Sequence, residues 1–117
     1  MENINILLVD DHKMFLDGIK MLLQDQPELN IVAEAANGKL ALEILKQQKI
    51  DLVITDISMP EINGIELTRK IKEFNSSIKV LVLSMNNERE IVSEIMMSEA
   101  EGYILKNTGK DELVNAI

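Results

Sequence analysis

The chain has 117 residues, enough for one domain with a single hydrophobic core. It contains no cysteine and only one histidine, which excludes disulfides, thiolate zinc sites and clusters of histidine ligands. The net charge of −8 argues against direct binding of a nucleic-acid backbone. The strand pattern begins too early for a signal peptide, and no apolar stretch could cross a bilayer. We therefore expect a cytoplasmic domain that does not contact membrane.

Short apolar runs alternate with helical periodicity along the whole chain. Alternating strands and helices predict a parallel sheet, and continuously apolar strands predict helices on both of its faces. The expected fold is α/β and flavodoxin-like, a doubly wound five-stranded parallel sheet with the order 2-1-3-4-5 that is usual for this fold. The strands are expected at residues 4–9, 31–35, 52–55, 80–83 and 103–105, and the helices at 14–23, 40–45, 65–74, 88–97 and from 111 onward.

Most of the predicted strands end in a residue that can do chemistry. Asp10 and Asp11 follow the first strand, Asp56 the third, Ser84 the fourth and Lys106 the fifth. In an open parallel sheet these ends form one edge, where ligands bind. Clustered carboxylates with a lysine suit a magnesium ion and phosphoryl transfer, and a carboxylate can itself become an aspartyl-phosphate.

Four blocks of sequence, in this order and spacing, resemble the response-regulator receiver domain of two-component signalling. The resemblance covers residues 1–117, and the segment after Asp10 and the segment around Lys106 are most similar to the NarL/FixJ branch of transcriptional regulators. The four blocks are Leu8-Val9-Asp10-Asp11, Asp56-x-x-Met59-Pro60-x-x-x-Gly64, Val82-Leu83-Ser84 and Gly102-Tyr103-Ile104-Leu105-Lys106.

The resemblance implies that Asp56 accepts a phosphoryl group from the phosphohistidine of a histidine kinase. It also implies a site for Mg²⁺, or Mn²⁺, held by Asp11, Asp56 and the backbone carbonyl of Ser58, with Asp10 supporting the metal from the second shell. By the same resemblance, the chain is a phosphoacceptor and not a turnover enzyme. Self-phosphorylation from small donors and self-dephosphorylation are the most it would catalyse.

The resemblance further implies a switch between two states. Ser84 and Lys106 would contact the phosphoryl oxygens, and Tyr103 would turn inward as Ser84 moves, changing the surface around the fourth helix and fifth strand. The rate of dephosphorylation would be tuned by Ser58, Met85 and Asn86.

The expected partners are a histidine kinase and a second copy of the chain after phosphorylation. DNA would be reached only through a C-terminal DNA-binding domain that is not part of this sequence, and the fifth helix is expected to be incomplete at Ile117.

Simpler interpretations stay open at this point. Asp10 and Asp11 could begin a polar loop and cap the next helix, Ser84 could cap its strand, and His12 could merely shape the first loop. Two other functions also remain open. One is a stand-alone receiver that acts by binding a protein. The other is a magnesium-dependent phosphatase, for which Ser58 stands where a second acid would be needed.

Overall fold

A computed structural model of the chain describes residues 3–56, 63–84, 100 and 102–105. The predicted helices at 88–97 and beyond 111 lie outside these residues, as do Ser58, Met85, Asn86 and Lys106.

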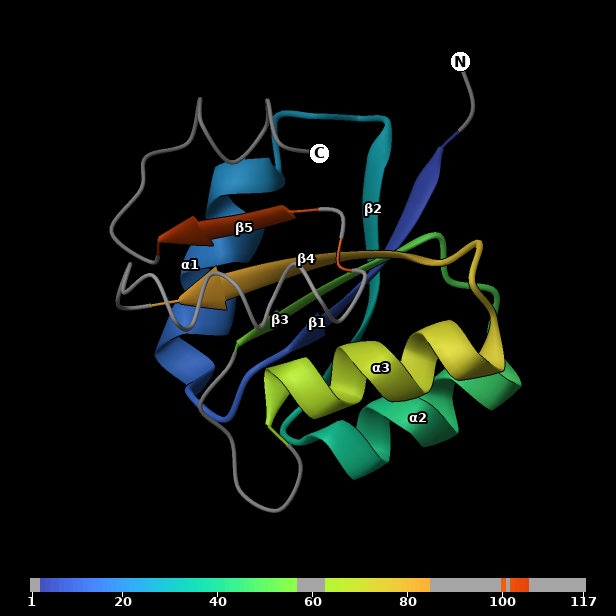
Figure 1. Ribbon diagram of the computed structural model, residues 1–117. Coiled ribbons are helices and arrows are strands. Elements are labelled where there is room, and N and C mark those ends of the chain that lie inside the picture. The colour runs from blue at the N-terminus through green and yellow to red at the C-terminus, as the bar shows by residue number, and fades with distance from the viewer. Residues whose placement is uncertain (1–2, 57–62, 85–99, 101, 106–117) are drawn as a thin grey trace.

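The described strands form one parallel sheet with the order β2-β1-β3-β4-β5, so the predicted strand order is confirmed (Figure 1). Consecutive parallel strands need a connection that carries the chain back to the end of the sheet where the strands begin. The helices α1, α2 and α3 lie in the connections from β1 to β4. The strands are β1 (Ile4–Val9), β2 (Leu29–Ala35), β3 (Leu52–Asp56), β4 (Lys79–Ser84) and β5 (Gly102–Leu105).

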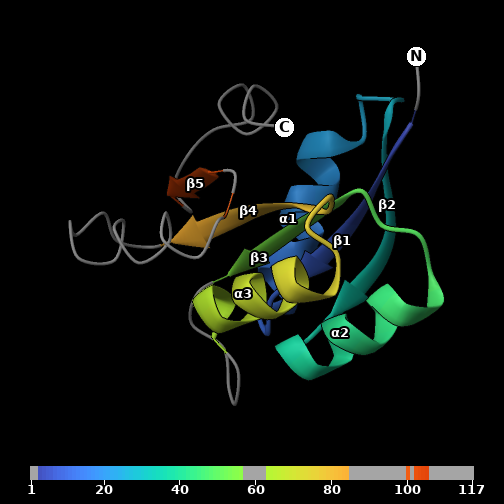
Figure 2. The same ribbon diagram turned by 45° about the vertical axis from the view of Figure 1, so that its right-hand side comes forward.

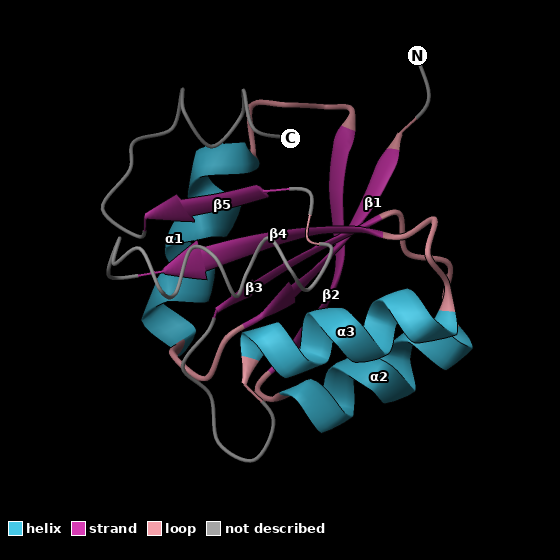
Figure 3. Ribbon diagram, in the orientation of Figure 1, coloured by secondary structure: helices cyan, strands magenta, loops and turns pink. Residues whose placement is uncertain are grey.

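The described helices cover both faces of this sheet, as predicted (Figures 2 and 3). Helix α1 (Lys13–Leu23) lies on one face, and α2 (Gly38–Gln47) and α3 (Gly64–Phe74) lie side by side on the other. Successive strand residues point to opposite faces, so β1, β2, β3 and β4 each contribute to two separate cores. Ile6 and Leu8 pack with α1, whereas Leu7 and Val9 pack with α2 and α3.

The register sets the level at which each strand ends. Val9 of β1 pairs with Thr55 of β3, and Thr55 pairs with Val82 of β4. The residues that follow Val9 and Thr55 are Asp10 and Asp56, which therefore leave neighbouring strands at the same height. This pairing places the two carboxylates next to each other at the carboxyl edge of the sheet.

Two asparagines begin the helices that follow β2 and β3. The side chain of Asn37 accepts a hydrogen bond from the Leu40 amide at 2.9 Å, and Asn63 accepts one from the Glu66 amide at 2.9 Å. Asparagine is a favoured N-cap because its side-chain oxygen binds an amide that the helix itself leaves unpaired. Helix α2 therefore begins at Gly38, two residues before the start at residue 40 that the apolar pattern predicts.

Strand β2 begins two residues earlier than the apolar pattern indicates. Ile4 pairs with Leu29 and Asn5 with Asn30, ahead of the predicted start at Ile31. Asparagine has a low intrinsic preference for strands, so the apolar pattern does not predict a strand at Asn30. Backbone pairing with β1 nevertheless stabilises the strand conformation there.

Candidate functional site

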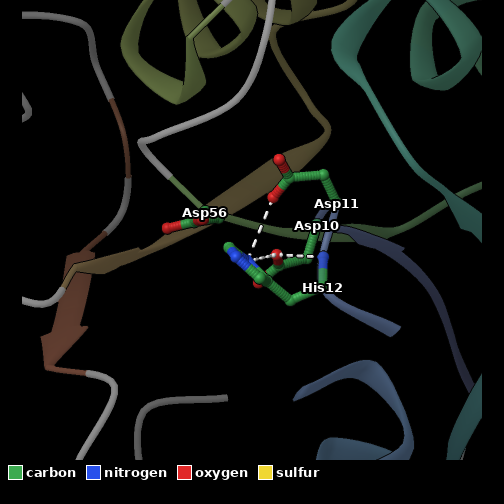
Figure 4. A group of neighbouring side chains, drawn as sticks. All are labelled: Asp10, Asp11, His12 and Asp56. Carbon is green, nitrogen blue, oxygen red and sulfur yellow. Dashed lines mark hydrogen bonds and ion pairs between the residues drawn. The ribbon is translucent and has the colours of Figure 1, made fainter. Parts of the chain in front are cut away.

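Three carboxylates and one imidazole meet at the carboxyl edge of the sheet (Figure 4). The residues are Asp10, Asp11, His12 and Asp56, and each offers a ligand atom within 4.8 Å of the others. Asp10 and Asp56 are almost fully buried, with 2% and 3% of their surface exposed, whereas Asp11 and His12 are exposed. The expectation that the acids after β1 and β3 converge is confirmed.

Burying Asp10 and Asp56 together has an electrostatic cost. Two carboxylates no more than 4.8 Å apart repel each other by at least about 3 kcal/mol at an effective dielectric of 20. A divalent cation removes this repulsion, and carboxylate oxygens are the ligands that hard cations such as Mg²⁺ prefer. The donors of this cluster therefore fit a metal ion.

His12 lies beside the acidic side chains, and its backbone also takes part in the loop between β1 and α1. Its Nδ1 atom is 3.0 Å from Asp10 Oδ1 and 3.1 Å from Asp11 Oδ1, and its backbone N–H donates to Asp10 Oδ1 at 2.9 Å. His12 is also the N-cap residue of α1, but its side chain makes no capping bond. The only signal for this role in the sequence is that His12 directly follows the acid pair.

The contacts of Asp10 also concern the simpler interpretation, in which the acid pair begins a polar loop and caps the next helix. Asp10 Oδ1 accepts the amide of His12, the residue that precedes the first turn of α1. Asp10 thus orders the start of the helix and also points into the acidic cluster, so the two interpretations are compatible.

Thr55 is a second residue whose contact with the site was not anticipated. It is fully buried, and its hydroxyl donates to the backbone carbonyl oxygen of Asp56 at 3.0 Å. That carbonyl belongs to the peptide group that joins Asp56 to residue 57. Thr55 can therefore restrain the peptide immediately after Asp56.

The remaining predicted site residues are placed only through their strands. Ser84 is the last residue of β4 and pairs with Leu105 of β5, which directly precedes Lys106 in sequence. Tyr103 lies in β5 and pairs with Val82. The backbone thus brings Ser84 to the edge of the sheet where Asp56 ends β3. The other four predicted residues, Ser58, Met85, Asn86 and Lys106, lie outside the described residues.

No helix within the described ranges has the length and apolar character needed to cross a membrane.

Comparisons with known proteins agree with the architecture. The family described as the response regulator receiver domain matches residues 6–117. The transcriptional regulatory protein DegU of Brevibacillus brevis is 36% identical over 114 residues, which are 97% of this chain and 48% of DegU. The nitrate/nitrite response regulator protein NarL of Escherichia coli K12 is 35% identical over 116 residues, 99% of this chain and 54% of NarL. The chain thus spans about half the length of these relatives.

Solved structures show the same fold. The isolated REC domain of RcsB from Salmonella enterica serovar Typhimurium, determined with the phosphomimetic BeF3−, matches with a TM-score of 0.91 and 32% identity. The match covers 97% of this chain and 85% of that one. A two-component response regulator of the LuxR family from Aurantimonas sp. SI85-9A1 matches with a TM-score of 0.91 and 30% identity, over 97% of this chain and 81% of that one.

Proposed function

The chain belongs to the response regulator receiver family, among regulators of the NarL/LuxR type, and from this premise we propose that it is a signalling switch that accepts a phosphoryl group on Asp56. The observation that carries the proposal is the position of Asp56. It ends β3, is 3% exposed, and lies within 4.8 Å of ligand atoms from Asp10, Asp11 and His12. A carboxylate held beside a cation site in this way is suited to attack phosphorus.

The reaction needs only one bond to form and one to break. A carboxylate oxygen of Asp56 attacks the phosphorus of a phosphohistidine, the P–N bond breaks, and the imidazole of the kinase leaves with its electron pair. Asp11, Asp56 and the backbone carbonyl of Ser58 would hold Mg²⁺ or Mn²⁺. Asp10 would support these ligands without binding the ion itself. When bound, the cation neutralises charge that develops on the phosphoryl oxygens. Asp56 is the group that is modified, so the chain is a phosphoacceptor.

The response to phosphorylation depends on residues at the ends of β4 and β5. A phosphoryl group adds about −1.5 to −2 charge and three acceptor oxygens at the site. Ser84 would donate its hydroxyl to one oxygen and Lys106 would pair with another. Movement of Ser84 would then let Tyr103 turn inward and change the surface of the fourth helix and fifth strand. Ser58, Met85 and Asn86 would set how quickly water removes the phosphoryl group.

The proposed partners of the chain, and its proposed effect on transcription, are inferred from its relatives and not from the described residues. We propose a histidine kinase as donor, a homodimer as the phosphorylated form, and a cytoplasmic location. We also propose that a C-terminal DNA-binding domain follows residue 117 in the whole protein and converts the change into control of transcription. The support is that DegU is named a transcriptional regulatory protein and that this chain spans about half its length.

Incubation with acetyl phosphate and Mg²⁺, followed by intact-mass measurement, tests the phosphoacceptor directly. The expected result is the gain of one phosphoryl group by the wild-type chain and none by Asp56→Asn. Asp51→Asn is a matched control, because Asp51 directly precedes the other end of β3. Its Oδ2 accepts the Asn5 amide at 2.9 Å, which an asparagine oxygen can also accept. This variant should be phosphorylated like the wild type.

Two outcomes would overturn the proposal. Phosphorylation that persists in Asp56→Asn would place the phosphoacceptor elsewhere. Multiple turnovers on p-nitrophenyl phosphate, with no stable phosphorylated chain, would instead indicate the magnesium-dependent phosphatase.

A further inference from the structure

The sequence contains two Asn-Gly pairs, and the structure places each at the start of a helix. Asn37 is the N-cap of α2 and Asn63 is the N-cap of α3, so Gly38 and Gly64 are the first residues of these helices. Asparagine before glycine is prone to spontaneous deamidation, because glycine has no side chain to hinder attack by its backbone nitrogen. Each pair is therefore a candidate site of covalent modification.

Deamidation consumes one water and needs no enzyme. The backbone nitrogen of Gly38 loses its proton to solvent and attacks Cγ of Asn37. The bond from Cγ to the side-chain nitrogen then breaks, and that nitrogen takes up a proton from solvent and leaves as ammonia. Water opens the resulting five-membered imide at either carbonyl, which gives aspartate or isoaspartate.

The folded backbone holds both asparagines away from this ring closure. The ψ angle is 170° at Asn37 and 169° at Asn63, and this extended conformation turns the glycine nitrogen away from Cγ. The side-chain oxygens accept the amides of Leu40 and Glu66, each at 2.9 Å. Rotation about the Cα–C bond of either asparagine would break its capping bond. Ring closure therefore requires the capped turn to open locally.

At Asn37, the turn that follows is held less firmly than the chain that precedes. Ala35 is 3% exposed, and its carbonyl oxygen accepts the Asp10 amide at 3.0 Å. After the cap, by contrast, Lys39 is exposed, Leu40 is 44% exposed, and the first turn of α2 contains no acidic residue. The charge of Lys39 also lies at the positive end of the helix dipole, which disfavours it. The first turn of α2 is therefore the part that opens most easily.

The first turn of α3 has the same cap but is packed more tightly. Ile65 is 6% exposed and Leu67 is fully buried, whereas Glu66 places an acidic side chain where the helix dipole favours it. Exposing one buried leucine or isoleucine changes an opening equilibrium by roughly 10- to 100-fold. When opening and closing are fast, the rate of a reaction in the open form follows the population of that form. The two Asn-Gly pairs should therefore react at different rates.

We propose that Asn37 is a site of spontaneous deamidation in the folded chain, and that opening of the first turn of α2 sets its rate. Aspartate at residue 37 would keep the cap, since aspartate and asparagine are similarly good N-caps, and the helix dipole would stabilise its charge. Isoaspartate would add a carbon atom to the main chain and displace the cap. The modification would occur whether or not Asp56 accepts a phosphoryl group.

Peptide-mapping mass spectrometry during incubation in mildly alkaline buffer measures the two conversions separately. In urea that unfolds the chain, Asn37 and Asn63 should react at similar rates, because the dipeptide is the same. In the folded chain, Asn37 should convert at least about tenfold faster than Asn63. Hydrogen exchange measures the opening independently. Relative to its rate in the unfolded chain, the Leu40 amide should exchange at least about tenfold faster than the Glu66 amide.

Two substitutions of the exposed Lys39 should move the rate in opposite directions. Lys39→Glu places an acid at the helix N-terminus and should slow deamidation of Asn37 by about 2- to 5-fold. Lys39→Gly lowers the helix propensity of the turn and should accelerate deamidation by a similar factor. Each rate is divided by the rate of the same variant in urea, which removes any effect on the intrinsic chemistry. Conversion of Asn63 should not change and is the matched control.

Conversion of Asn37 no faster than that of Asn63 in the folded chain would overturn the proposal, as would absence of conversion at both residues. Similar protection of the Leu40 and Glu66 amides from exchange would overturn it too. So would equal corrected rates for Lys39→Glu and Lys39→Gly, because the first turn of α2 would then not control the reaction.

Discussion

The hydroxyl of Thr55 offers a test of how the peptide after Asp56 is held. Thr55→Val keeps the β-branched shape that suits a strand and removes only the hydroxyl. Thr55 is fully buried, and the hydrogen bond that is lost joins Oγ1 to the Asp56 carbonyl oxygen at 3.0 Å. The substitution therefore changes a single polar contact next to the proposed phosphoacceptor.

The expected size of the effect follows from that contact. A neutral hydrogen bond of this kind contributes about 0.5–1.5 kcal/mol net. Burial of the additional apolar methyl group of valine offsets part of the stability lost with the hydrogen bond. The free energy of unfolding should therefore change by less than about 1.5 kcal/mol. If the hydrogen bond orients the peptide that leads to the Ser58 carbonyl, its loss should weaken Mg²⁺ binding by about 2- to 12-fold, which is the same energy expressed as an affinity.

The assay compares Thr55→Val with a matched substitution elsewhere. Thr68 in α3 is also fully buried, and its hydroxyl donates to the Gly64 carbonyl oxygen at 2.7 Å. Thr68→Val should therefore show a stability change of similar size and wild-type affinity for Mg²⁺. Affinity is measured by amide NMR titration with Mg²⁺, and stability by urea unfolding.

The reasoning is refuted if Thr55→Val binds Mg²⁺ as tightly as the wild type. It is also refuted if Thr68→Val loses as much affinity, because the effect would then report general loosening of the core and not the peptide after Asp56.

Three further predictions concern the scaffold that carries the site. Lys20 of α1 and Glu34 of β2 form an ion pair at 2.7 Å with side chains 39% and 28% exposed, so a double-mutant cycle in urea should give a coupling of about 0.5–1 kcal/mol. Most of this coupling should vanish in 1 M NaCl, where the Debye length is about 3 Å, and a coupling that persists would contradict a screened pair. Asn63→Ala should cost about 1 kcal/mol of unfolding free energy and Asn63→Gly only a few tenths, and equal losses would show that the capping bond to α3 is not the cause. Ile71→Ala should lower the free energy of unfolding by about 2–5 kcal/mol because Ile71 is fully buried. Phe74→Ala should lower it far less because Phe74 is 50% exposed. Similar unfolding midpoints of the two variants in urea would contradict this.

The pattern of strands and helices predicted most of the architecture, and the order usual for a flavodoxin-like sheet supplied the strand order. Apolar runs located the β strands, and their alternation with helices predicted the parallel sheet with both faces covered. The prediction succeeded because buried strands must be apolar wherever helices cover both faces. The errors lie at the ends of elements. Helix α2 starts at Gly38 and not at residue 40, and β2 starts at Leu29 and not at residue 31, because capping by Asn37 and pairing with β1 depend on neighbouring residues.

The functional site, like the fold, was determined partly by the sequence and partly by the tertiary structure. That Asp10, Asp11 and Asp56 would meet was determined by sequence alone, since each follows or ends a strand and parallel strands end at one edge. Only the tertiary structure decided that Asp10 and Asp56 are buried while Asp11 stays exposed. The sheet register and the covering helices control that difference.

The contacts of His12 and Thr55 were decided by the tertiary structure as well. Nothing in the sequence marks Thr55 as part of the site, and the only sign for His12 is that it directly follows the acid pair. The ring of His12 reaches Asp10 and Asp11 because the chain turns sharply between β1 and α1. The hydroxyl of Thr55 donates to the Asp56 carbonyl oxygen at a fully buried position in β3, where water cannot take its place. Sequence determines which groups arrive at the edge of the sheet, whereas distances of about 3 Å between them depend on the packed backbone that carries them.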